Sequence, residues 1–147
     1  MSIRQKVVPG GRPMLDTRSV IAIVDDDESI CRAVKRLLRF AGMEADTFTS
    51  GQEFLDFIDT VPWVRVECIV LDMHMPGMNG LEMHERLLQM GNCPPVIFIS
   101  AEDNPLASEE AFAAGAVDFL RKPVKDHVLI ESLHRALKRV ERSDVNS

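Results

Sequence analysis

The sequence predicts an α/β protein, a doubly wound sandwich in which helices cover both faces of a single parallel sheet. Short apolar runs recur along the chain from Val20 onward, and longer amphipathic segments separate them. Because strands that alternate with helices are joined by right-handed crossovers, this alternation favours parallel strands. We expect five strands in the spatial order 2-1-3-4-5 and five helices.

Four of the strands are predicted by short apolar runs and the fifth by a mixed segment. The runs span residues 20–24, 68–71, 96–99 and 117–120, and residues 44–48 mix polar and apolar side chains, as an edge strand does. Two helices are predicted by apolar residues that share one helical face, and three more are expected at residues 51–58, 81–90 and 106–114. The apolar face of the first of these helices consists of Ile30, Val34, Leu37, Leu38 and Ala41. That of the second, near the end of the chain, consists of Leu129, Leu133, Ala136, Leu137 and Val140.

The chain has the length and composition of one domain. It has 147 residues, of which 46% are hydrophobic and 27% charged, enough to bury a full core. Residues 1–18 contain Pro9, Gly10, Gly11 and Pro13 without apolar periodicity, so we expect a flexible leader there. The domain is then expected to span residues 19–142, with a short tail at 143–147.

Composition also excludes several classes of protein. No apolar stretch has the length of a membrane span or of a signal peptide, so we expect a cytoplasmic protein that does not bind a membrane. The formal net charge of −6 argues against direct nucleic-acid binding by this segment. The cysteines at 31, 68 and 93 show no metal-type spacing, and we expect reduced thiols.

Polar residues follow the predicted strands, at the edge of the sheet where an open α/β fold binds its ligand. Asp25 and Asp26 follow the first strand, and Asp72 follows the third. Ser100 follows the fourth strand and Lys122 lies shortly after the fifth. Crowded carboxylates repel one another unless a cation joins them, and oxygen ligands of this kind suit Mg²⁺. Such a pocket is able to stabilise a phosphoryl group during transfer to a carboxylate nucleophile.

Four segments resemble the signature segments of the receiver domains of bacterial two-component response regulators. They are IVDDDES, VLDMHMPGMNG, FISAED and DFLRKPV, in the same order and spacing as in that family. The resemblance covers residues 19–142 and implies a flavodoxin-like (βα)5 fold. It implies a signalling protein rather than an enzyme in the usual sense. Such a protein catalyses only its own phosphorylation and autodephosphorylation.

The resemblance also implies a role for each pocket residue. Asp72 would accept the phosphoryl group, and Ser100 and Lys122 would contact it. Asp25, Asp26, Asp72 and the backbone carbonyl of His74 would hold Mg²⁺ or Mn²⁺. Outside this group, Phe119 would act with Ser100 as the switch, His74 and Glu102 would tune the rate of hydrolysis, and the Lys122–Pro123 peptide would be cis.

The partners implied are a sensor histidine kinase and an effector domain or target protein. The phrases MPGMNGLE and AGAVDFLRKP look most like receivers that precede a C-terminal helix-turn-helix effector, which would make the output transcriptional. For such a regulator we expect phosphorylation to promote a homodimer through residues 106–114 and 118–120. The cognate kinase and the target are not visible in the sequence.

Each residue also has an ordinary structural interpretation. Asp27 is a good helix N-cap, so we leave it out of the metal site. Ser100 alone most often satisfies local backbone, and a lone Lys122 is usually solvated. The histidines at 84, 127 and 134 share no ligand spacing, and we expect them at the surface. Cys68, inside a strand, is expected to be a small core residue.

Three other functions fit parts of the pattern. An aspartyl phosphatase would use the same nucleophile, but it normally places an aspartate two residues later, where this chain has His74. A flavin-phosphate module would need a glycine- and hydroxyl-rich loop where Asp25 and Asp26 stand. A receiver-like domain that has lost phosphorylation would lack pocket residues that are all present here.

Overall fold

The computed structural model describes residues 18–61, 64–101 and 105–146. Its sheet has five parallel strands in the order β2-β1-β3-β4-β5, which confirms the predicted order. The strands are β1 (Arg18–Val24), β2 (Ala45–Phe48), β3 (Val64–Asp72), β4 (Val96–Ser100) and β5 (Asp118–Arg121). The helices are α1 (Glu28–Phe40), α2 (Gly51–Thr60), α3 (Gly80–Met90), α4 (Pro105–Ala113) and α5 (Asp126–Asn146).

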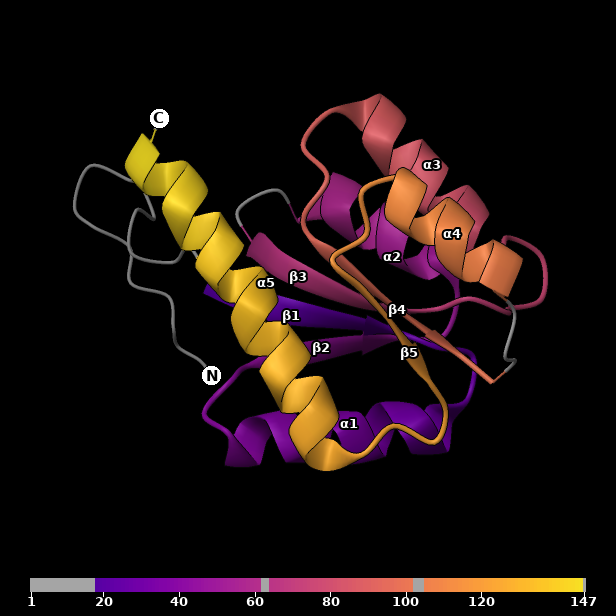
Figure 1. Ribbon diagram of the computed structural model, residues 1–147, viewed down its shortest axis with the longest axis horizontal. Helices are drawn as coiled ribbons and strands as arrows, with labels where there is room; N and C mark the ends of the chain where they lie inside the picture. The colour runs from indigo at the N-terminus through magenta and orange to yellow at the C-terminus, as the bar shows by residue number, and fades with distance from the viewer. Residues whose placement is uncertain (1–17, 62–63, 102–104, 147) are drawn as a thin grey trace.

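Two layers of helices enclose the sheet. Helices α1 and α5 cover one face, and α2, α3 and α4 cover the other (Figure 1). Each face has its own apolar cluster. Leu38 and Leu133 belong with Ile21 to the cluster on the first face, and Phe54 and Met83 belong with Phe98 to the cluster on the second. Burial of large side chains contributes roughly 1.5–3 kcal/mol each, so these two clusters supply most of the driving force for the fold.

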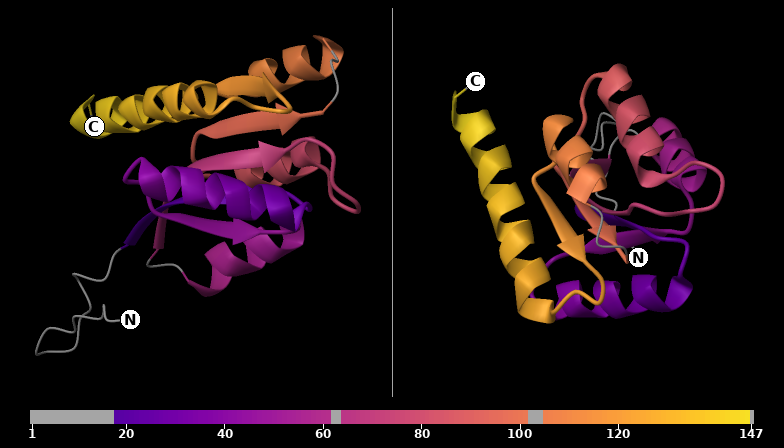
Figure 2. Two further views of the ribbon diagram at one scale, coloured as in Figure 1. Left: turned by 90° about the horizontal axis from the view of Figure 1, so that it is seen from below. Right: turned by 45° about the vertical axis from the view of Figure 1, so that its right-hand side comes forward.

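The central strands are buried on both faces, and the edge strands are not. Every residue of β4 and residues 20–24 of β1 are buried, whereas β2 and β5 include half-buried positions. This burial explains why continuous apolar runs predicted β1, β3 and β4 and a mixed segment predicted the edge strand β2. The other edge strand, β5, was predicted from a run that Asp118 interrupts. The right-hand view in Figure 2 shows the sheet between α1 and α5 on one side and α2, α3 and α4 on the other.

Strand and helix ends differ from the sequence prediction in a few places. β3 begins at Val64 rather than residue 68, because its first residues pair with the start of β1, Arg18 with Val64. Helix α5 continues to Asn146, past the predicted end of the domain at residue 142. The leader lies outside the described residues, except Arg18, which begins β1.

Helix caps account for several helix starts. Asp27 is the N-cap of α1, and its side chain accepts from the backbone N–H groups of Ser29 and Ile30, as predicted. Asn79 begins α3 with a capping box, in which Asn79 and Glu82 each accept from the other's backbone N–H. These caps fix the helix starts that flank the carboxyl ends of β1 and β3.

One predicted surface residue is buried. His84 has only 3% of its surface exposed, so its predicted surface location is wrong. It lies on the face of α3 that packs against the sheet, together with Gly80, Met83 and Leu87. The spacing of these residues, not the chemical type of the side chain, decides which side of the helix is buried. His127 and His134 are exposed, as predicted.

The cysteines are free thiols, as predicted, and Cys68 is fully buried in β3. Burial raises the pKa of the Cys68 thiol to about 12, and burial followed by the charge of Asp25 raises that of Cys31 to about 11. Both thiols therefore stay protonated at neutral pH.

Among the described helices, none is long and apolar enough to cross a membrane.

Candidate functional site

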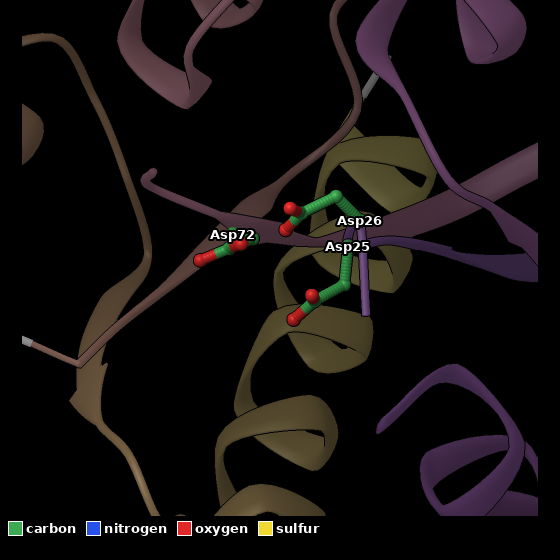
Figure 3. Close-up of side chains that lie close together, drawn as sticks. All are labelled: Asp25, Asp26 and Asp72. Carbon is green, nitrogen blue, oxygen red and sulfur yellow. The ribbon is translucent and has the colours of Figure 1, made fainter. Parts of the chain in front are cut away.

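Three carboxylates meet where β1 and β3 end, the point at which the strand order reverses. Side-chain oxygens of Asp25, Asp26 and Asp72 all lie within 4.8 Å of one another (Figure 3). Asp72 is the last residue of β3, and Asp25 follows β1 directly. Since β1 and β3 are neighbours in register, Val24 opposite Leu71, the next residues of the two strands come side by side.

The lysine predicted for the site completes this cluster. The Nζ atom of Lys122 lies 3.0 Å from Oδ2 of Asp25 and 3.4 Å from Oδ1 of Asp72. Its backbone N–H donates to the carbonyl of Ser100 over 2.8 Å, which ties the loop after β5 to the end of β4. The Lys122–Pro123 peptide is cis, as predicted.

Burial differs sharply among the three carboxylates. Asp25 and Asp72 are buried, with 3% and 4% of their surface exposed, whereas Asp26 is exposed. The backbone N–H of Asp27 donates to Asp25 over 2.9 Å, and that of His74 donates to Asp72 over 3.4 Å. The cluster therefore has two fixed carboxylates at its base and one at the solvent.

Charge crowding perturbs the ionisation of this cluster. Burial and then the charge of Asp25 raise the pKa of Asp72 from its ordinary 3.8 to about 6, against the opposing effect of Lys122. Burial disfavours the charge on Lys122, but its hydrogen bond to Asp25 and the charge of Asp72 outweigh that effect and raise its pKa. The lysine stays charged at neutral pH, and negative charge remains in excess around Asp72.

This excess makes the donor set suitable for a divalent cation. Three carboxylates offer only hard oxygen ligands, the type that Mg²⁺ selects, and the exposed Asp26 leaves one side open to water. A cation there would offset the repulsion that raises the pKa of Asp72. The residues present therefore fit the Mg²⁺ that the sequence predicts.

The other predicted site residues are distributed around the cluster. Ser100 is fully buried at the end of β4, and the exposed His74 lies two residues after Asp72. Phe119 is half-buried in β5 and packs against Phe98, with ring centroids 6.5 Å apart, rather than against the carboxylates. Glu102 lies outside the described residues.

One residue that positions the site was missed by sequence reasoning. A Cβ atom on Gly80 would lie 2.5 Å from the backbone oxygen of Asp72, so only glycine lets α3 approach the end of β3 this closely. The N–H of Gly80 also donates to the carbonyl of Met73. The available signal was a glycine directly after the cap residue Asn79 and shortly after a strand end.

Comparisons with known proteins agree with this geometry. Residues 21–134 match the family model described as response regulator receiver domain. The chain belongs to the response regulator receiver domain family. A solved response regulator receiver protein from Burkholderia phymatum has 47% sequence identity and a TM-score of 0.73, over 82% of this chain and 95% of that one.

Longer regulators are also similar to this receiver domain. Response regulator protein TmoT of Ectopseudomonas mendocina is 35% identical over 94% of this chain and 61% of its own length. Transcriptional regulatory protein FixJ of Bradyrhizobium diazoefficiens is 35% identical over 86% of this chain and 60% of its own. This chain thus spans about three fifths of the length of these curated relatives. Receiver domains in general pair with sensor kinases and effector domains.

Proposed function

We propose that this receiver domain is a phosphorylation switch that accepts a phosphoryl group on Asp72, with Mg²⁺, from a sensor histidine kinase. The observation that carries the proposal is the cluster of Asp25, Asp26 and Asp72 with Lys122 at its side. Asp72 ends the central strand β3, lies beside both other carboxylates and pairs with the lysine. Asp25 shares these contacts, and Asp72 is assigned as the nucleophile because it stands at the position that receiver domains phosphorylate.

The proposed reaction transfers the phosphoryl group from the kinase's histidine to Asp72. An oxygen of Asp72 attacks the phosphorus of the donor, an O–P bond forms, and the P–N bond to the kinase's histidine breaks. The imidazole leaves with the electron pair of that bond and takes up a proton. Bound Mg²⁺, held by Asp25, Asp26, Asp72 and the carbonyl of His74, would offset charge on the phosphoryl oxygens.

Lys122 and Ser100 act on the product. With an oxygen of Asp72 phosphorylated as an acyl phosphate, the ammonium group of Lys122 is in position to pair with a phosphoryl oxygen, and the hydroxyl of Ser100 is at the same end of the sheet to donate a hydrogen bond. Phe119 then turns inward as Ser100 moves toward the phosphoryl group. Water later attacks the phosphorus and releases inorganic phosphate, at a rate tuned by His74 and Glu102.

The output that fits best is control of a partner or an effector domain through the surface of α4, β5 and α5. On α4, Leu106 and Phe112 are 67% and 48% exposed, two of the five exposed large apolar side chains in the described part of the chain; the others are Phe40 of α1 and Leu88 and Met90 of α3. We propose that phosphorylation promotes a homodimer through this surface and β5. The transcriptional role of relatives such as FixJ supports a transcriptional output.

Intact mass tests the phosphorylation. The protein is incubated with a small phosphodonor such as acetyl phosphate and Mg²⁺, with and without chelator, and compared with Asp72→Asn. A single labile phosphate adduct that needs both Asp72 and the metal is expected. Asp59→Asn, a change to an aspartate on α2, is the matched control and should leave the adduct unchanged. No adduct on the wild type with several donors would overturn the proposal.

Size analysis tests the dimer separately. Fully phosphorylated protein is expected to shift from monomer to dimer, and Phe112→Glu on α4 should prevent the shift without removing the phosphate adduct. Arg32→Glu, a substitution on the exposed surface of α1, serves as the control. A monomer that persists after full phosphorylation would contradict the proposed dimer and leave the phosphorylation itself intact.

A further inference from the structure

His84 is a buried ionisable side chain that the proposed phosphoryl chemistry does not use. It has 3% of its surface exposed, and its Nδ1 atom has no hydrogen-bond partner among the described residues. Burial lowers the pKa of His84, so the ring is neutral at physiological pH. A neutral imidazole with an unsatisfied nitrogen is a poor filler for an apolar core compared with leucine.

The imidazole belongs to a row of three rings that runs from α3 to β5. The centroids of His84 and Phe98 are 5.4 Å apart, with the rings at 73°, an edge-to-face contact. Phe98, fully buried in β4, in turn lies 6.5 Å from Phe119 at 40°. Because the interior is close-packed, displacement of one ring in this row changes the space available to the next.

A cavity beside His84 offers a place for a charged imidazole. It has a volume of about 420 Å³, lies between α3 and α4, and has His84 in its lining. The ionisable groups that line it with His84 are Glu82 and Glu85 of α3 and Glu110 of α4, while β4 presents the uncharged ring of Phe98. Glu82 already accepts a hydrogen bond from the N–H of Asn79, so Glu85 and Glu110 are the carboxylates better placed to pair with an imidazolium.

We propose that His84 is a positioning residue for the switch and that it acts through Phe98 on Phe119. A proton on His84 and a phosphoryl group on Asp72 then favour the same arrangement of Phe119. A protonated ring leaves the apolar row and turns toward the acidic cavity. The space it vacates lets Phe98 and then Phe119 move inward, the direction expected on phosphorylation. This inference rests on the proposed function for the role of the phosphoryl group, but the coupling between His84 and Phe119 does not.

Reciprocity makes the coupling measurable from either end. If a proton on His84 and a phosphoryl group on Asp72 favour the same inward Phe119, then the phosphoryl group must raise the proton affinity of His84 by the factor by which the proton raises the affinity of the site for that group. A smaller side chain at position 119, which releases Phe98, should also raise the proton affinity of His84. We expect at least about a threefold increase, which is half a pKa unit. A residue with only a structural role would show no such change in its titration.

NMR titration of the histidine side chains provides the test. The pKa of His84 is measured in the wild type, in Phe119→Ala and Phe119→Leu, and in the wild type with Mg²⁺ and beryllofluoride, a mimic of the phosphoryl group. Exposed His134 on α5 is the internal control. The pKa of His84 is expected to rise in both Phe119 variants and with beryllofluoride, while that of His134 stays constant.

The outcomes separate the two proposals. An unchanged pKa of His84 in whichever Phe119 variants remain folded, or in the beryllofluoride complex, overturns the coupling. Failure of beryllofluoride to bind would count against the proposed function, and the Phe119 variants would still decide the coupling. In His84→Leu, the additional gain in beryllofluoride affinity that the wild type shows as pH falls through the lowered pKa of His84 should disappear.

Discussion

Two of the sites where ionisable side chains are buried in the described part of this domain are buried in opposite ways. At the carboxyl end of β1 and β3, Asp25 and Asp72 are buried together with a lysine that pairs with both. Under α3, His84 is buried against an aromatic ring with one nitrogen unsatisfied. The first site retains charges and their repulsion, whereas the second stays neutral. Buried charge with partners serves chemistry at the site, and a buried neutral base can respond to packing.

The largest expected effect on stability comes from removing Lys122, the cationic partner of Asp25 and Asp72. Lys122→Ala leaves Asp25 and Asp72 buried without their cation, which should destabilise the metal-free protein by about 3 kcal/mol. Urea unfolding at pH 7.5 in chelator measures it, with the exposed Lys125→Ala as the control. Equal stability of the two variants would mean that the lysine pairing does not matter.

A gain in stability, the opposite of the effect at Lys122, is expected when Asp72 is replaced. Its folded-state pKa of about 6 lies above its ordinary 3.8, so the protein loses stability as pH rises through that window. Asp72→Asn removes this loss and should stabilise the metal-free protein at pH 8 by up to about 3 kcal/mol, with little gain at pH 3.5. Urea unfolding in chelator at both pH values tests this, and a variant less stable than wild type at pH 8 would refute it.

Sequence reasoning recovered most of the fold and the paired site, because both depend on local signals. Apolar runs marked the inner strands, and polar residues at their ends marked Asp25 and Asp72. The approach of Gly80 to the backbone of Asp72 was missed because it depends on how α3 meets β3. His84 was misplaced because its residue type was weighed above its position between Met83 and Leu87 on the buried face of α3.

The close approach of Gly80 gives the next effect in size. Gly80→Ala brings a methyl group into conflict with the backbone of Asp72, and we expect a loss of about 2 kcal/mol together with slower phosphorylation. Gly51→Ala is the control, since its methyl group would meet the flexible side chains of Met78 and Met83 instead. If Gly80→Ala and Gly51→Ala unfold at the same urea concentration, the backbone contact is not a constraint on the site.

The smallest effect on stability is expected at His84. His84→Leu replaces an unsatisfied nitrogen with an apolar side chain and should stabilise the protein at pH 7.5 by about 1 kcal/mol. The folded-state pKa of His84 is lowered, so wild-type stability falls as pH drops below the ordinary value, and the variant should lack that part of the loss. Thermal unfolding from pH 7.5 to 5 checks both, and an unchanged pH dependence would show that His84 is not buried as a neutral base.

Chemical trapping of the phosphorylated residue tests the central claim most directly. Sodium borohydride reduces an aspartyl phosphate to homoserine, so protein incubated with phosphodonor and Mg²⁺ is reduced, digested and mapped by mass spectrometry. Homoserine at position 72, formed only when donor and metal are both present, is the predicted result. Homoserine at Asp25, Asp26 or another aspartate, with none at position 72, would contradict the assignment of Asp72 as the phosphoryl acceptor.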